Sequence, residues 1–277
     1  MEYFRPPDVE QGSKHPLLVY AYAGPGSLQV TSRYHFGSTI TNWLRYLGSA
    51  LNIEIASVDV RGTMGLGEDW KFQLYKKLGT IEIEDQIEFA KTRVADSTHI
   101  NPEEVAVFGW SYGGFVASHV LGQQKENTYK CGIAVAPVTS QRYYDTAYTE
   151  RYMGLITDPN GQEIYEKTDL FPLAKNFTGS QYFIAHGTHD DNVHFRNFAT
   201  LVHALNTAGV QYRQQIYIDE DHSILTPEQS RHLFQAMTNF LTHDCFEDGF
   251  MPPTIPPTDP SHASVCSSSL ALLIMAL

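Results

Sequence analysis

The chain has 277 residues, 42% of them apolar, and a formal net charge of −12, so it can bury a sizeable core in one large α/β domain or two small ones. A net acidic chain without blocks of Lys and Arg is a poor candidate for binding nucleic acid or an anionic membrane. No stretch reaches the roughly 18 apolar residues of a membrane span, and three cysteines are too few for a dense disulfide framework.

Apolar segments of strand length alternate with segments of helical periodicity. Strands are expected at Leu17–Ala23, Ile53–Val58, Val105–Gly109, Cys131–Ala136, Tyr182–Ala185 and Gln215–Ile218. Helices are expected at Thr39–Ala50, Ile81–Val94, Gly113–Leu121, Phe195–Leu205 and Pro227–Leu241. Because the strands are continuously apolar, helices should cover both faces of the sheet. We therefore expect one α/β domain over residues 16–246, with a doubly wound, mostly parallel sheet.

Three regions depart from this alternation. Residues 1–15 read as an N-terminal extension without the features of a signal peptide, which favours a cytosolic protein or one that has lost its front end. Residues 137–175 are rich in tyrosine and should be helical in pieces, as in a lid or a substrate-binding insertion. Residues 247–277 are rich in proline and serine, and we expect a disordered tail. Its apolar end is too short for a membrane span and marginal as a GPI signal.

The segment Gly109-Trp110-Ser111-Tyr112-Gly113 matches the pattern G-x-S-x-G. It lies between a predicted strand and a predicted helix, where this pattern forms a sharp turn that exposes the serine hydroxyl. Glycines relieve the crowding of such a turn, and the helix N-terminus directs free N–H groups at developing negative charge. We interpret Ser111 as a nucleophile rather than a serine in an ordinary turn.

A serine nucleophile needs a base, and in α/β-hydrolases the acid and then the base follow the serine along the chain. Asp190 and Asp191 follow one predicted strand, and His222 follows the last one. Because the strands are parallel, these loops should lie at the sheet edge that carries Ser111. The acid is then at 190 or 191, and His222 is the base rather than a solvated loop histidine.

A cluster of histidines and carboxylates invites a second interpretation, which is a zinc site. Its members are His186, His189, Asp190, Asp191 and His194. Their spacing matches no zinc pattern and leaves the G-x-S-x-G segment unexplained. We therefore expect no metal and no cofactor.

Two stretches together point to a family. Residues 109–114, GWSYGG, and residues 186–195, HGTHDDNVHF, resemble the catalytic domain of the dipeptidyl peptidase IV group in the prolyl oligopeptidase family of serine peptidases. Residues 22–25, 131–137 and 143–154 agree with this resemblance, which extends from about Pro16 to Phe246. It implies an α/β-hydrolase fold.

The resemblance also implies a role for individual residues. Ser111 would be the nucleophile, Asp190 the orienting acid and His222 the general base. The hydroxyl of Tyr22 and the backbone N–H of Tyr112 would form the oxyanion hole, which suits acyl transfer. The substrate would be held by Asn192, at a backbone carbonyl, and by a pocket for proline or alanine lined by Val138, Tyr144, Tyr148 and Val193.

One position departs from the family pattern. Gln141 stands where the family usually has a tryptophan, so the proline pocket would lose a wall. The alternative for the tyrosines near it is that they simply pack the insertion. Family members also carry a β-propeller domain that grips the N-terminus of the substrate, and this chain begins at the hydrolase domain.

The resemblance further implies a disulfide between Cys131 and Cys245, with two buried thiols as the alternative. A disulfide indicates an oxidising compartment, so an extracellular or cell-surface location is expected. The sequon Asn176-Phe177-Thr178 agrees with this location and predicts glycosylation at Asn176. A homodimer is expected by analogy with the family.

These expectations favour a serine peptidase that releases N-terminal Xaa-Pro or Xaa-Ala dipeptides through an acyl-enzyme intermediate. Two alternatives remain open. One is a catalytically weak or inactive surface or scaffolding relative, and the other is a general serine esterase of the same fold.

Overall fold

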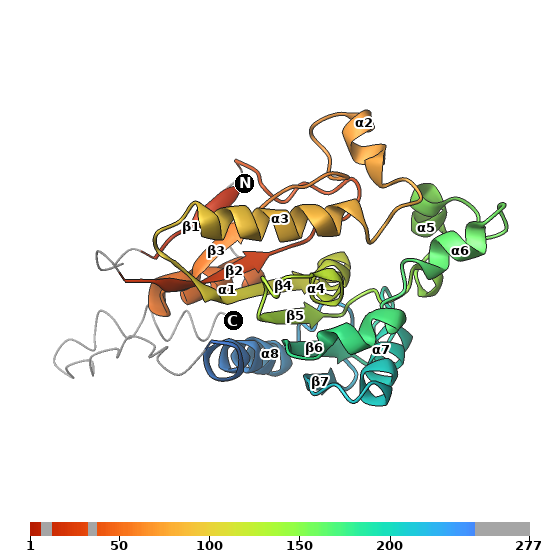
Figure 1. Ribbon diagram of the computed structural model, residues 1–277. Coiled ribbons are helices and arrows are strands. Elements are labelled where there is room, and N and C mark those ends of the chain that lie inside the picture. The colour runs from red at the N-terminus through yellow and green to blue at the C-terminus, as the bar shows by residue number, and fades with distance from the viewer. Residues whose placement is uncertain (7–12, 33–37, 247–277) are drawn as a thin grey trace.

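The computed structural model describes residues 1–6, 13–32 and 38–246 of the chain (Figure 1). The expected tail at 247–277 lies outside the described residues, as does part of the expected N-terminal extension. The remainder folds around a single sheet.

Seven strands form this sheet in the order β1-β3-β2-β4-β5-β6-β7. Neighbouring strands are parallel except β1, which runs antiparallel to β3. The strands are β1 Glu2–Phe4, β2 His15–Tyr20, β3 Glu54–Ser57, β4 Ile100–Trp110, β5 Cys131–Val135, β6 Gln181–Gly187 and β7 Arg213–Tyr217. All six predicted strands are present, and the mostly parallel sheet is confirmed. The three exposed residues of β1 carry no pattern from which a strand could be predicted.

The five predicted helices are also present. They are α1 Thr39–Ala50, α3 Ile81–Ala95, α4 Tyr112–Gln123, α7 Arg196–Thr207 and α8 Pro227–Asn239. The last one ends two residues earlier than predicted, because the chain continues into a π-helical turn, η4 Phe240–Cys245. Shorter helices are α2 Glu68–Lys71, α5 Thr146–Met153 and α6 Gly161–Glu166, with 3₁₀ turns η1 Phe72–Leu74, η2 Gln141–Tyr143 and η3 Phe171–Phe177. The insertion at 137–175 is therefore helical in pieces, as predicted.

Helices cover both faces of the sheet, and Figure 1 shows α3 and α8 on opposite sides of the strands. Because side chains alternate along a strand, Leu17 and Val19 of β2 enter one core with residues of α3, α4 and α7. Leu18 enters the other core with residues of α1 and α8. This double coverage explains why the strands are apolar at consecutive positions.

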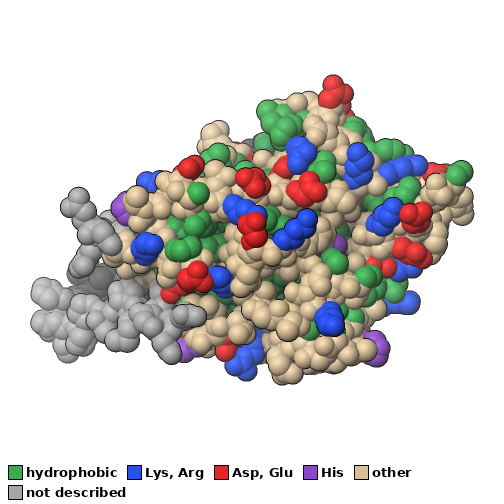
Figure 2. All heavy atoms as spheres, in the orientation of Figure 1, with side chains coloured by type: hydrophobic (Ala, Val, Ile, Leu, Met, Phe, Trp, Pro, Cys, Tyr) green, Lys and Arg blue, Asp and Glu red, His purple; other side chains and the backbone are tan. Residues whose placement is uncertain are grey.

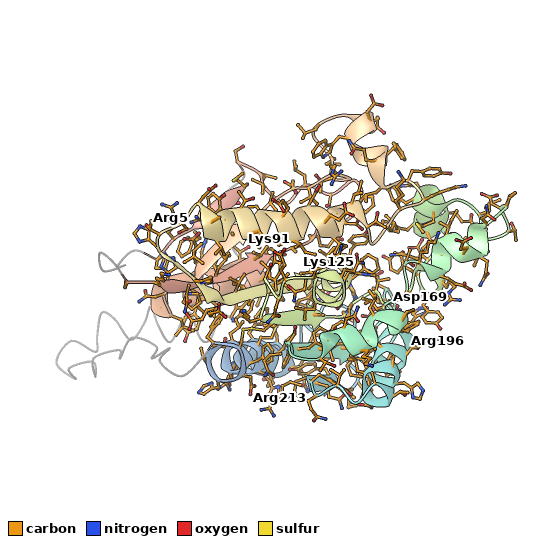
Figure 3. All side chains as sticks on the ribbon, in the orientation of Figure 1. Arg5, Lys91, Lys125, Asp169, Arg196 and Arg213 are labelled. Carbon is orange, nitrogen blue, oxygen red and sulfur yellow. A yellow bond between two sulfur atoms is a disulfide. The ribbon has the colours of Figure 1, made fainter. Side chains whose placement is uncertain are left out.

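A disulfide joins Cys131, at the start of β5, to Cys245 in η4. The predicted pairing is confirmed, and it fastens the end of η4, the last helical segment of the described residues, to the central part of the sheet. Nearby, Arg213 of β7 donates to Asp244 at 2.8 Å (Figure 3). Both links lie where β5 and β7 begin, at the opposite edge of the sheet from the end of β4 that leads to Ser111.

The surface in Figure 2 carries basic and acidic side chains intermingled, with no large patch of one sign on that face. Within the described part of the chain, none of the helices combines the length and the apolar character that crossing a membrane requires.

Candidate active site

The turn between β4 and α4 holds Ser111 in a strained conformation, with φ of 62° and ψ of −118°. A residue other than glycine rarely adopts positive φ, and it does so here in the strand–turn–helix context predicted for a nucleophile. A Cβ added to Gly109 would lie 2.0 Å from the carbonyl oxygen of Gly113, and one added to Gly113 would lie 2.3 Å from that of Ala21. The turn therefore requires glycine at both positions.

Asp190 and His222 meet at the same edge of the sheet, after β6 and β7. Nδ1 of His222 lies 2.8 Å from Oδ2 of Asp190. Because a carboxylate only accepts, the imidazole donates from Nδ1, and in the neutral tautomer with this bond Nε2 is an acceptor. Asp191, the other candidate acid, is exposed to solvent.

The environment of Asp190 keeps its carboxyl group ionised. Burial tends to raise the pKa of Asp190, but hydrogen bonds from His186 and His222 outweigh it and hold that pKa well below its usual range. The second oxygen, Oδ1, accepts from the backbone N–H groups of Asn192 at 3.0 Å and Val193 at 2.8 Å. The loop after β6 is thus wrapped around one buried negative charge.

The loop that carries His222 is fastened to the nucleophile turn. The indole Nε1 of Trp110, the residue before Ser111, donates to the backbone carbonyl of His222 at 3.0 Å. In the described structure no hydrogen bond joins the Ser111 hydroxyl to His222. Such bonds are often long without substrate and tighten in the reacting complex.

His186 is a part of this site that sequence reasoning missed, since it was considered only as a metal ligand. It is fully buried at the end of β6, and its Nε2 lies 2.7 Å from the carbonyl oxygen of Val193 and 3.1 Å from Oδ2 of Asp190. Both partners are acceptors, so Nε2 carries a proton. The sequence placed His186 directly after the apolar run Tyr182–Ala185, which indicates burial but does not identify its partner. Among the described residues, no group of three or more potential ligands is arranged to hold a metal ion.

The two residues predicted for the oxyanion hole lie side by side. The ring centroids of Tyr22 and Tyr112 are 6.4 Å apart. A Cβ added to Gly24 would lie 2.9 Å from Tyr22 and 3.4 Å from Tyr112, so this glycine allows the close approach. Burial raises the pKa of Tyr22, which keeps its hydroxyl protonated and able to donate.

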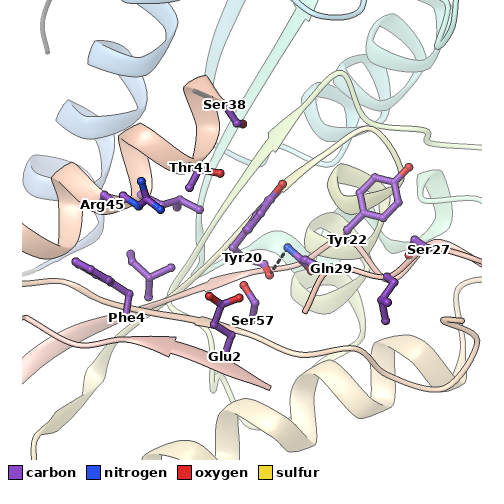
Figure 4. Close-up of a pocket in the computed structure, with 13 residues that line it drawn as sticks. Glu2, Phe4, Tyr20, Tyr22, Ser27, Gln29, Ser38, Thr41, Arg45 and Ser57 are labelled. Atoms are coloured by element: carbon purple, nitrogen blue, oxygen red, sulfur yellow. Dashed lines mark hydrogen bonds between the residues drawn. The ribbon is translucent and has the colours of Figure 1, made fainter. Parts of the chain in front are cut away.

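Tyr22 also borders a cavity of about 790 Å³ (Figure 4). The other walls come from β1, β3, α1 and the segment around Gln29, whose amide donates to the carbonyl of Tyr20 at 3.1 Å. The Tyr22 ring therefore stands between an open cavity and the buried ring of Tyr112.

The predicted substrate-binding residues lie near the sheet edge that carries Ser111 and Asp190. The hydroxyl of Tyr144 donates to Asn192 Oδ1 at 2.8 Å, and the rings of Tyr144 and Tyr148 make an edge-to-face contact at 5.3 Å. Val138 donates its backbone N–H to the carbonyl of Ser111 at 3.4 Å, and Val193 is fully buried beside Asp190. Tyr144 and Asn192 also line a cavity of about 360 Å³.

Two cationic contacts brace the insertion near this cavity. Arg142 forms an ion pair with Asp169, and the guanidinium of Arg196 lies 4.5 Å from the ring centroid of Tyr143. Figure 3 places Asp169 and Arg196 at the same end of the molecule. The aromatic segment at 143–148 is thereby held against the start of α7.

Gln141 and Asn176 also have defined surroundings. Gln141 is buried, and within the described structure its side-chain amide has no hydrogen-bond partner, although its backbone N–H donates to Thr168 at 3.4 Å. Asn176 is exposed, and its Nδ2 donates to the carbonyl of Gly122 at 2.7 Å. Glycosylation at Asn176 stays a prediction.

Comparisons with known proteins agree on one family. The model of the prolyl oligopeptidase family matches residues 37–247. Over 241 residues, 87% of this chain, the sequence is 42% identical to dipeptidyl peptidase 4 of Sus scrofa and 41% identical to prolyl endopeptidase FAP of Mus musculus. The chain covers 30% and 31% of those two proteins.

A solved structure leads to the same result. The crystal structure of dipeptidyl peptidase 4 from Porphyromonas gingivalis superposes with a TM-score of 0.79 and 34% identity, over 86% of this chain and 32% of that protein. The chain thus spans about a third of the length of the proteins it resembles. With its α/β fold, its strained serine turn and these matches over most of its length, the chain belongs to the prolyl oligopeptidase family of serine peptidases.

Proposed function

We propose that this chain is a serine peptidase that releases N-terminal Xaa-Pro or Xaa-Ala dipeptides. The observation that carries the proposal is the 2.8 Å bond between His222 and the buried carboxylate of Asp190, at the sheet edge where Ser111 stands on its strained turn. The dipeptidyl peptidase names of several relatives support the same class of reaction.

The proposed mechanism assigns one of these residues to each step of acyl transfer. Nε2 of His222 takes the proton of the Ser111 hydroxyl as its oxygen attacks the substrate carbonyl, and ionised Asp190 stabilises the imidazolium that forms. The negative tetrahedral oxygen accepts hydrogen bonds from the Tyr22 hydroxyl and the Tyr112 backbone N–H. The imidazolium then protonates the leaving amine, and water activated by the same histidine hydrolyses the acyl-enzyme.

The substrate proposal rests on the aromatic surroundings of Ser111. The rings of Tyr144 and Tyr148 make an edge-to-face contact and pack against the core cluster that contains Val138 and Val193. An aromatic and apolar surface of this kind suits a flat proline ring or a small alanine. Asn192, already bonded to Tyr144, would bind a backbone carbonyl of the peptide. We also propose an extracellular or cell-surface location, which the disulfide supports, and a homodimer.

The proposal is tested with a chromogenic Gly-Pro dipeptide that has a free amine, an N-blocked version of it, and a Ser111→Ala control. We expect cleavage of the free-amine substrate that is lost in the control. Equal cleavage of both substrates would replace the exopeptidase assignment with an endopeptidase or a promiscuous hydrolase. Hydrolysis of p-nitrophenyl esters without peptide cleavage would favour the esterase. A Ser111 that no fluorophosphonate probe labels would favour a scaffolding relative.

A further inference from the structure

A buried carboxylate outside the predicted triad reaches the residue next to the nucleophile. Glu82, in the first turn of α3, is fully buried, and its Oε1 accepts a hydrogen bond from the hydroxyl of Tyr112 at 2.9 Å. Tyr112 begins α4 directly after Ser111, and its backbone N–H belongs to the proposed oxyanion hole. The contact therefore links the start of one helix to the catalytic turn at the start of another.

Helix capping explains only part of this arrangement. The Glu82 carboxylate also accepts from the backbone N–H groups of Gly79 at 2.6 Å and Thr80 at 3.0 Å, which fixes the chain just before α3. A carboxylate that caps a helix can remain in water, where it costs less to hold the charge. Glu82 is instead buried against α4, where the Tyr112 hydroxyl supplies its third donor.

The segment that bears Glu82 is itself held against α4. Gly79 has φ of +80°, and a Cβ there would lie 3.0 Å from the ring of Phe115. Its carbonyl accepts from Gln123 at 2.8 Å, and the same amide donates to Nδ1 of His119 at 2.7 Å. The carboxylate thus has a fixed position relative to the helix that Tyr112 begins.

The Tyr112 ring contacts two other residues of the site. Its centroid lies 6.4 Å from that of Tyr22, the proposed second oxyanion donor, and 6.4 Å from that of Tyr148, a proposed wall of the substrate pocket. A shift of this ring would change the space available to both side chains. Catalysis loses rate steeply when reacting groups are displaced by fractions of an ångström.

We infer that Glu82 is a positioning residue of the active site, which holds the Tyr112 ring by its hydroxyl and so fixes the oxyanion donors relative to Ser111. The inference rests on the proposed function, because the oxyanion role of Tyr112 belongs to it. Glu82 acts through Tyr112 and does not touch the substrate.

The test measures the rate constant for labelling of Ser111 by a fluorophosphonate, together with kcat and KM for the dipeptide substrate. The variants are Glu82→Gln, Tyr112→Phe and the double variant. Gln86→Leu is the matched control, because Gln86 is buried one turn later on α3 and its amide has no partner within the described structure. A thermal melt of each variant reports whether it folds.

We expect Glu82→Gln and Tyr112→Phe each to lower the labelling rate and kcat about tenfold, with KM within about twofold of wild type. Gln86→Leu should leave these rates within about twofold. Glu82→Gln removes the charge of the acceptor and Tyr112→Phe removes the donor of the same hydrogen bond. Adding Glu82→Gln to Tyr112→Phe should therefore cost less than about twofold more. If Glu82 had a purely structural role, Glu82→Gln would lower the melting temperature, and the rate losses of the two single variants would not overlap in the double variant.

Two results would overturn the inference while leaving the proposed function intact. One is Glu82→Gln labelled as fast as Gln86→Leu, and the other is losses from Glu82→Gln and Tyr112→Phe that multiply. If Glu82→Gln does not fold, Tyr112→Phe alone decides, because it keeps the ring and removes only the hydroxyl. Wild-type protein with no Ser111-dependent labelling would overturn the proposed function, and this inference with it.

Discussion

One carboxylate oxygen, Oδ2 of Asp190, is shared by two imidazoles. His222 contacts it at 2.8 Å from the loop after β7, and His186 contacts it at 3.1 Å from the end of β6. The first belongs to a loop whose backbone accepts a hydrogen bond from Trp110, the residue before Ser111, and the second is buried in the core. His186 therefore helps to hold the carboxylate that contacts His222, and in the proposed mechanism it would orient the acid.

Replacing His186 by phenylalanine should lower kcat about tenfold with little change in KM. Asp190 would lose a buried hydrogen-bond donor, so its carboxylate would be held less firmly against His222. A planar aromatic ring is kept, somewhat larger than the imidazole, in a pocket where Phe195 and Phe198 already lie 5.8 and 6.0 Å from the imidazole between ring centroids. Steady-state kinetics on the dipeptide checks this. His203→Ala, on the exposed side of α7, is the control, and equal kinetics of the two variants would contradict the assignment.

Gly113→Ala should abolish labelling of Ser111 and lower the free energy of unfolding by at least about 3 kcal/mol, because the new methyl group would overlap the backbone at Ala21. Gly179→Ala is the comparison. Gly179 also has positive φ, at +91°, but a Cβ there meets nothing within 4 Å. Its alanine variant should lose only about 1–2 kcal/mol and label normally. Urea denaturation and probe labelling give both quantities, and similar losses would refute the steric argument.

Stability should depend on pH through Glu82. Burial raises the pKa of Glu82 to about 7 from an ordinary value of 4.5, against the opposing hydrogen bonds from Gly79, Tyr112 and Thr80. The titratable groups that face it are Tyr112 of α4 and Tyr148 of α5, and burial raises the pKa of both tyrosines, so neither supplies a compensating charge.

Between pH 4.5 and about 7 the folded protein holds the Glu82 proton more tightly than the unfolded chain does. The Glu82 contribution to the free energy of unfolding therefore falls as pH rises through this window, by ~3 kcal/mol in total. Urea denaturation of wild type and Glu82→Gln across the window checks this. We expect the wild-type curve to fall relative to that of the variant, and parallel curves would contradict the prediction.

Removing the disulfide should destabilise the fold and spare the site. Cys131 and Cys245 are 114 positions apart, so Cys245→Ser should cost about 4 kcal/mol and lower Tm by about 10 °C. Labelling of Ser111 at low temperature should persist, because the bond lies at the far end of β5 from the nucleophile turn. Reductant should lower the Tm of wild type and leave that of Cys245→Ser unchanged. Equal sensitivity of the two would show that the bond does not form.

Gln141→Leu should stabilise the protein by about 1 kcal/mol, because it removes a buried amide that has no partner within the described structure while keeping its size. Gln162→Leu is the control. The Gln162 amide donates to Glu166 at the surface at 3.0 Å, so its removal should not stabilise the protein. Thermal melts compare the two. A lower Tm for Gln141→Leu would mean that the amide has a partner, such as an ordered water molecule.

The amino-acid sequence by itself determined the layer architecture and the sharp strand-to-helix turn that carries Ser111. Consecutive apolar positions such as Leu17, Leu18 and Val19 predict a strand covered on both faces, because alternate side chains enter opposite cores. The pattern around Ser111 predicts its turn because only glycine fits at its flanks. The pairing of Cys131 with Cys245 came from a family resemblance, and no local pattern contains it.

The tertiary structure alone decided which buried polar groups serve the site. His186 and Glu82 lie in an apolar strand and a charged helix, and no local pattern distinguishes them from ordinary core or capping residues. Asp190 follows His186 by four positions (i,i+4), whereas Tyr112 is 30 positions from Glu82. Both contacts exist only after β6 and α3 have packed. Burial then makes each hydrogen bond obligatory, because an unpaired polar group in the core costs more than the bond contributes.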